Sequence, residues 1–200
     1  MSDLEKAKNI IDKDIIQLDV EYIDFDGNNQ VGIIEIHKSV CDEVKSIFEE
    51  IKQSGFIIEK IKTIDNYNYD DEESVKDNNT SGYNFRFVSG TTKLSDHAVG
   101  LAIDINPALN PWLHPSALNI FRYDPSKEGT IVRDGDVVKI FEKYGWSWGG
   151  NWKNPDFQHF FKGGDLNKSI KNNLYEESGI ENPYLKKSRI SKFKDFIKRI

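Results

Sequence analysis

Four side chains have the types and the spacing of a catalytic zinc site. His97 and Asp104 lie in the stretch Ser-Asp-His-Ala-Val-Gly-Leu-Ala-Ile-Asp, and Asp156 and His159 follow in Asp-Phe-Gln-His. Catalytic zinc takes three protein ligands, often two imidazoles and a carboxylate, and keeps a fourth position open. His97, Asp104 and His159 supply that set. Asp156 is then a second carboxylate, placed to act as general base for the attacking water.

The same residues have structural explanations that the sequence leaves open. A lone histidine is more often a surface or capping residue than a ligand, and we assign His37 and His114 to that class. Asp104 and Asp156 could be turn carboxylates. For Asp104 this explanation is weak, because an unpaired charge in an otherwise apolar strand is costly to bury without a cation.

The spacing also constrains the local structure around these residues. Asp104 follows His97 by seven positions, an odd number that would place them on opposite faces of one unbroken strand. We therefore expect His97 to lie in an irregular approach to a strand over residues 99–105, with a bend at Gly100. The same argument places Asp156 in a turn, since it precedes the second histidine by only three residues.

These motifs resemble those of the zinc peptidases that cut peptidoglycan stem peptides, which are the D-alanyl-D-alanine carboxypeptidases and the L-alanyl-D-glutamate endopeptidases. The similarity extends from about residue 36 to residue 160. It implies Zn²⁺ as the cofactor, metal ligands at His97, Asp104 and His159, and a catalytic carboxylate at Asp156. It also implies a peptidoglycan stem peptide as the substrate.

One departure from the family concerns its catalytic arginine. Many relatives carry an Arg at the end of an early core strand, but the corresponding residues 64–70 include no basic side chain. Arg86 is the only Arg before Arg122, and its segment resembles one branch of the family. The resemblance therefore implies that Arg86 stabilises the oxyanion.

Four further side chains are candidate substrate contacts. The resemblance implies such contacts at Ser95, Asn78 and Asn79. Trp148 begins the element Trp-Gly-Gly-Asn-Trp and is either a core residue or a wall of the substrate cleft. The two glycines would let an extended peptide lie close to the backbone, although a turn alone explains them equally well.

We expect metal-assisted hydrolysis of an amide bond, and two other classes of function stay open. One is a catalytically silent zinc domain that binds cell-wall peptides, against which the retention of Asp156 argues. The other is an interaction domain without a metal, which a measurement of metal content would distinguish. The sequence does not choose between cleavage of D-Ala-D-Ala and of L-Ala-D-Glu, nor between exopeptidase and endopeptidase action.

Composition limits the cellular setting. One compact domain is expected for 200 residues, and the single Cys41 gives no sign of a disulfide-forming compartment. A formal charge of −6 argues against nucleic acid as a partner, and we expect a monomer.

The first thirty residues lack an uninterrupted apolar core, so we expect no signal peptide and a cytoplasmic protein as written. The protein could then act on the wall after lysis, as phage endolysins do, or after export. It could also act on imported wall fragments, or the sequence could lack a native leader.

The C-terminal segment differs in charge from the rest of the chain. Residues 184–200 carry seven basic side chains and one acidic side chain, with apolar residues at helical spacing. One interpretation is a helix packed against the acidic body. The other is an amphipathic helix that contacts anionic lipid or a wall polymer. We therefore divide the chain into a zinc peptidase domain, residues 1–165, and a C-terminal extension, residues 166–200.

The predicted fold class is α+β, with a small central antiparallel sheet, flanking helices and the zinc site at the sheet. The resemblance implies the fold of the D-Ala-D-Ala peptidases and of hedgehog domains. A helix is expected from the N-cap Ser39 to Gly55, whose left-handed conformation would end it. The other expected elements are a helix over residues 135–145, strands over residues 31–36, 56–63, 99–105, 146–152 and 157–161, and a polar loop with a short helix over residues 65–82.

Overall fold

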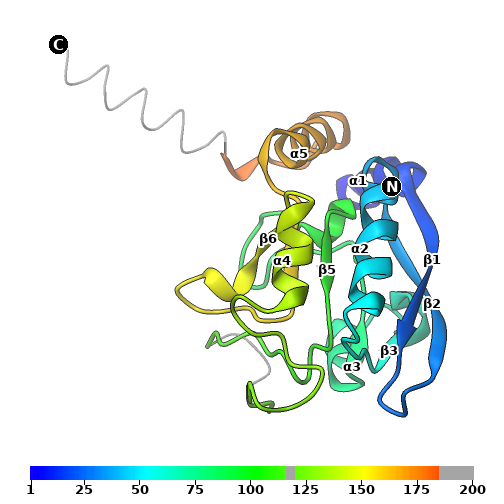
Figure 1. Ribbon diagram of the computed structural model, residues 1–200. Helices are drawn as coiled ribbons and strands as arrows, with labels where there is room; N and C mark the ends of the chain where they lie inside the picture. Colours follow the sequence, from blue (N-terminus) through cyan, green and yellow to red (C-terminus); the bar gives the residue numbers. More distant parts are fainter. Residues whose placement is uncertain (116–119, 185–200) are drawn as a thin grey trace.

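The computed structural model describes residues 1–115 and 120–184, and within them the chain forms helices and small sheets around one apolar core (Figure 1). This mixture of helices and sheets agrees with the predicted class. The strands are divided among three sheets, however, instead of forming a single central one. The α-helices are α1 (Asp3–Ile11), α2 (Cys41–Gln53), α3 (Asp71–Lys76), α4 (Asp136–Lys143) and α5 (Gly164–Ser178). The strands are β1 (Ile15–Ile23), β2 (Asn29–His37), β3 (Lys60–Ile61), β4 (Asn79–Thr80), β5 (Ala102–Asp104), β6 (Ser147–Trp148) and β7 (His159–Phe161).

Helix α2 is the centre of the apolar core. Figure 1 shows it between the long β1–β2 hairpin and helix α4. Val44, Ile47, Phe48 and Ile51 recur at three- and four-residue spacings, so that they share one face, and all four are buried. The helix predicted from this pattern is confirmed.

The two ends of α2 differ in how well the sequence predicts them. Gly55 has a φ of +77°, which confirms its predicted left-handed conformation just beyond the helix. The predicted N-cap at Ser39 is wrong. Residues Lys38–Val40 form a 3-10 turn, and the ring of His37 accepts a hydrogen bond from the backbone N–H of Ser39. His37 is therefore a capping residue, and α2 begins only at Cys41.

The antiparallel sheet that carries the candidate site has the strand order β5-β7-β6. Its strands are shorter than predicted, because the chain enters β5 through a 3-10 turn, His97–Val99, and a left-handed Gly100. This irregular approach confirms the expectation for His97. In the pairing of β5 with β7, Asp104 is directly opposite His159.

The N-terminal and C-terminal parts of the described chain pack against each other, which the sequence did not reveal. Helix α1 contacts α5, and strand β1 supplies half of the long hairpin (Figure 1). The predicted division between residues 165 and 166 falls within the first turn of α5. No helix in the described ranges is long and apolar enough to cross a bilayer. The basic amphipathic segment falls almost entirely on residues 185–200, outside the described ranges.

Gly100 shows how tightly the approach to the site is packed. Its φ is +64°, and an added Cβ would lie 2.5 Å from the backbone nitrogen of His37. That nitrogen donates a hydrogen bond to the carbonyl oxygen of Gly100 at 2.9 Å, so the two segments cannot separate without losing it. The 3-10 turn is thereby fixed against the end of β2.

We expect Gly100→Ala to lower the free energy of unfolding by about 3 kcal/mol, because it adds a backbone clash to the cost of a left-handed alanine. Gly55→Ala is the matched control. Gly55 also has a positive φ, but nothing lies within 4 Å of its added Cβ, so its cost should be only about 1 kcal/mol. Chemical denaturation in the presence of a chelator measures both, and equal costs would contradict the packing argument.

Candidate metal centre

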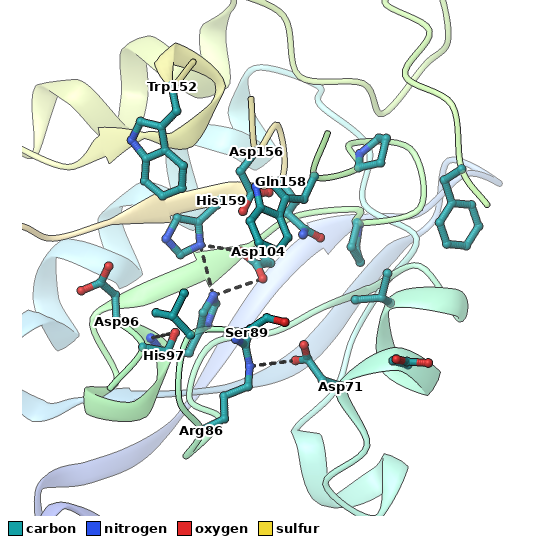
Figure 2. A pocket seen from close by; sticks show the side chains of 18 residues that line it. Asp71, Arg86, Ser89, Asp96, His97, Asp104, Trp152, Asp156, Gln158 and His159 are labelled. Carbon is teal, nitrogen blue, oxygen red and sulfur yellow. Dashed lines mark hydrogen bonds and ion pairs between the residues drawn. The ribbon is translucent and has the colours of Figure 1, made fainter. Parts of the chain in front are cut away.

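The three predicted metal ligands come from three different segments and meet at one point. His97 begins the 3-10 turn, Asp104 ends β5, and His159 begins β7. The antiparallel register brings Asp104 and His159 together, and the turn at Gly100 returns His97 toward both. Figure 2 shows the three side chains converging, and all three are buried.

The donor atoms lie close enough together to share one metal ion, although the two imidazoles contact different oxygens of Asp104. His97 Nε2 lies 3.1 Å from Asp104 Oδ2, His159 Nδ1 lies 2.9 Å from Asp104 Oδ1, and the two imidazole nitrogens are 3.2 Å apart. Ligands about 2.0–2.1 Å from a tetrahedral zinc ion are separated from one another by about 3.3 Å. Two nitrogens and one carboxylate oxygen are also a common catalytic zinc set. The residues therefore fit the metal that the motifs predict.

A hydrogen bond fixes the orientation of the His97 ring. Its Nδ1 lies 2.6 Å from the carbonyl oxygen of Gly82. A carbonyl can only accept, so Nδ1 carries a proton, and in the neutral ring Nε2 is the nitrogen left with a lone pair for a metal. A backbone carbonyl behind a ligating histidine is the usual outer partner in metal sites. His97 is therefore prepared to ligate through Nε2.

The charges in the cluster are strongly interdependent. Burial would raise the pKa of Asp104, but the neighbouring His97 charge and hydrogen bonds from both imidazoles hold it well below its usual range. Burial would lower the pKa of His159, whereas its hydrogen bond to Asp104 and the surrounding carboxylates raise it. The cluster thus needs positive charge beside Asp104, which protons or a metal ion can provide.

Asp156 lies in the turn before β7, as predicted, and its carboxylate is poorly satisfied. Its Oδ1 is buried and has no hydrogen-bond partner among the described residues. Burial raises the pKa of this carboxyl to about 7, against the opposing effect of the His159 charge. A buried carboxylate with spare acceptor capacity and a pKa near neutrality has the properties of a general base.

A cavity of about 240 Å³ opens beside the cluster and brings Asp156 and Arg86 to the same space. Arg86 is held there because its carbonyl accepts a hydrogen bond from the backbone N–H of Ser95, two residues before His97. Its Nε lies 3.2 Å from Asp71 Oδ1. Figure 2 shows Arg86 and Asp71 on the wall facing Asp156. The structure therefore places a guanidinium group across the cavity from the predicted base.

The predicted substrate contacts do not all reach this cavity. Ser95 lines it. Asn78 accepts a hydrogen bond from the backbone of Ala108, and Asn79 is buried and bonds to the backbone of Lys62, so both amides hold the fold together. Trp148 is a core residue whose Nε1 donates to a backbone carbonyl. The structure thus supports the core interpretation of Trp148.

Several cavity residues were missed by the sequence analysis. Trp152 is 42% exposed and lines the cavity, with its ring 5.5 Å from the His159 ring. Trp112 and Gln158 also line it, as does Asp96, the residue before the first ligand. The position of Asp96 beside His97 was a signal that could have been used. Trp112 offered no such signal, because only tertiary folding brings it to the site.

Comparison with known protein families gives one finding. Residues 89–162 match the model of a family described as D-alanyl-D-alanine carboxypeptidase. This match confirms the predicted resemblance over that stretch, which includes His97, Asp104, Asp156 and His159. Arg86 lies just outside it. No curated protein and no solved structure showed a significant match to the chain.

We expect the purified protein to bind one zinc ion, and His97→Ala to lose it. The loss of affinity should exceed the roughly 10- to 100-fold effect typical of outer-shell partners, because a ligand itself is removed. Equilibrium dialysis followed by metal analysis measures this. His114→Ala is the control, since His114 stacks on Trp112 at 4.5 Å and is not in the cluster. For the unmodified protein, affinity should fall as the pH is lowered, because both imidazoles must be neutral to ligate.

Proposed function

We propose that this chain is a zinc-dependent peptidase that hydrolyses peptidoglycan stem peptides. The observation that carries the proposal is the convergence of His97, Asp104 and His159 beside an unsatisfied Asp156, inside the stretch that matches the carboxypeptidase family. The small antiparallel sheet beneath the cluster is compatible with the fold of D-Ala-D-Ala peptidases and hedgehog domains. The substrate would be either the D-Ala-D-Ala or the L-Ala-D-Glu bond.

The metal ligands, Asp156 and Arg86 would have distinct roles in this reaction. Zinc, when held by the three ligands, would supply a Lewis acid that polarises the scissile carbonyl and activates water. Asp156 would take a proton from the attacking water and pass it to the leaving amine. Arg86, across the cavity, would stabilise negative charge on the carbonyl oxygen. Ser95 and Trp152 form parts of the wall that the peptide would contact.

The pairing of Arg86 with Asp71 bears on how the substrate is held. A carboxylate on the residue after the scissile bond would have to share Arg86 with Asp71. Both candidate substrates bring one, the terminal carboxylate of D-Ala or the free α-carboxylate of D-Glu, so the ion pair does not choose between them. Both substrates are therefore included in the test. Because peptidoglycan lies outside the cytoplasmic membrane, the proposal also requires that the protein reach it, by lysis or export.

We expect Asp156→Asn to reduce kcat by about 10²- to 10⁴-fold while zinc binding is retained, because the amide cannot accept the proton. Mass spectrometry of stem pentapeptide and purified peptidoglycan, incubated with each zinc-loaded protein, measures turnover. Release of terminal D-Ala would identify a carboxypeptidase, and cleavage between L-Ala and D-Glu an endopeptidase.

The control for this variant is Asp165→Asn, because Asp165 is fully exposed on α5 and should not matter. Normal turnover by Asp156→Asn would show that the base is misassigned. Intact substrates with zinc-loaded wild type would instead favour a silent zinc domain that binds wall peptides.

We expect Arg86→Ala to lower kcat by about 10²- to 10³-fold with zinc still bound, because an oxyanion donor is lost. Arg86→Lys should recover part of this loss, since it keeps the charge but not the planar fork. Steady-state kinetics on the substrate identified above, with metal analysis of each variant, tests this. An unchanged kcat in Arg86→Ala would remove Arg86 from the reaction.

A further inference from the structure

An ion pair between a buried lysine and a partly buried aspartate links helix α5 to the residue before the first metal ligand. Lys171 Nζ donates to Asp96 Oδ1 at 2.6 Å, and Asn167 Nδ2 donates to the same oxygen at 2.7 Å. Lys171 is only 8% exposed and Asn167 only 7%. Lysine is rarely buried to this degree unless it is paired. The two donors of α5 therefore hold one specific oxygen of Asp96.

The same helix also holds the segment of the second histidine ligand. Asn167 Nδ2 donates a further hydrogen bond, at 2.9 Å, to the carbonyl oxygen of Lys162, the residue that follows β7. The backbone N–H of Lys162 in turn donates to Leu101, just before β5. A single amide of α5 thus connects the turn that carries His97 with the end of the strand that carries His159.

Asp96 is placed to act on His159. It lines the same cavity as His159. Figure 2 shows Asp96 on the side of that ring away from Asp104. A ligating histidine usually has a carbonyl or carboxylate behind its second nitrogen, which fixes the ring and increases its basicity. His97 has the carbonyl of Gly82 in this role, and for His159 the candidate is the Asp96 carboxylate.

We propose that Lys171 and Asn167 of α5 are positioning residues of the metal centre, which hold the Asp96 carboxylate beside His159 and so orient that ligand. This inference rests on the metal site of the proposed function. Helix α5 begins at Gly164, beyond the stretch that matches the carboxypeptidase family. The site would therefore depend on a helix that lies outside the matched stretch.

The test compares zinc affinity and ligand geometry in variants of the full chain. We expect Lys171→Met to weaken zinc binding by about 10- to 100-fold, the usual effect of losing an outer-shell partner. Competition with a chromophoric chelator measures the affinity. The absorption spectrum of the cobalt-substituted protein reports the ligand geometry independently of activity, and it should change. Lys168→Met is the control, since Lys168 lies on the same helix and is 75% exposed.

A second variant separates positioning from stability. Lys171→Met alone leaves the partly buried Asp96 carboxylate without its cation, which destabilises the protein by itself. The double variant Asp96→Asn with Lys171→Met removes both charges and should recover much of the thermal midpoint in chelator. We expect its zinc affinity to stay low.

Wild-type zinc affinity in the double variant would overturn the inference, because the pair would then be merely structural. An equal affinity in Lys171→Met and Lys168→Met would overturn it as well. A wild-type protein that binds no zinc would instead refute the proposed function itself, so the two failures are distinguishable.

Discussion

The site depends on one buried carboxylate. Asp104 ends β5 in the interior, where a negative charge without a partner is strongly unfavourable. Two imidazoles, from His97 and His159, contact it from separate segments at 3.1 and 2.9 Å. Because all three groups must be present together, this cluster couples the 3-10 turn, β5 and β7. The elements around it are arranged so that their backbones can approach closely enough for these contacts.

Glycines provide that close approach on both sides of the cluster. Gly100 lets the turn of His97 pack against the end of β2. On the other side, an added Cβ at Gly149 would lie 2.8 Å from the carbonyl oxygen of Asp156 and 3.3 Å from the Cβ of His159. Gly149 also accepts the backbone hydrogen bond of Asp156 at 3.1 Å. The glycine of the Trp-Gly-Gly element therefore lets this turn pack against the turn that carries Asp156. The sequence had suggested only a turn or a close approach of the substrate at this element.

The sequence was sufficient where the chemistry is local and insufficient where it depends on tertiary contacts. The parity of the spacing between His97 and Asp104 required an irregular approach, and the structure has one. The amide of Asn79, a predicted substrate contact, bonds to the distant backbone of Lys62, which no local pattern reveals. For the same reason the sequence did not indicate that Lys171 reaches Asp96 across a long stretch of chain. Such pairs form only when helices and loops that are distant in sequence pack together.

The charges that line the cavity give an independent argument for a metal ion. Two of the carboxylates are compensated by fixed cations, since Asp71 pairs with Arg86 and Asp96 pairs with Lys171. Among the described residues, Asp104 is compensated only by imidazoles, and one oxygen of Asp156 is buried without a partner. A divalent cation in the cluster would stabilise both carboxylates with the histidines neutral, as ligation requires. The arrangement of the protein's own charges therefore favours a bound metal at neutral pH.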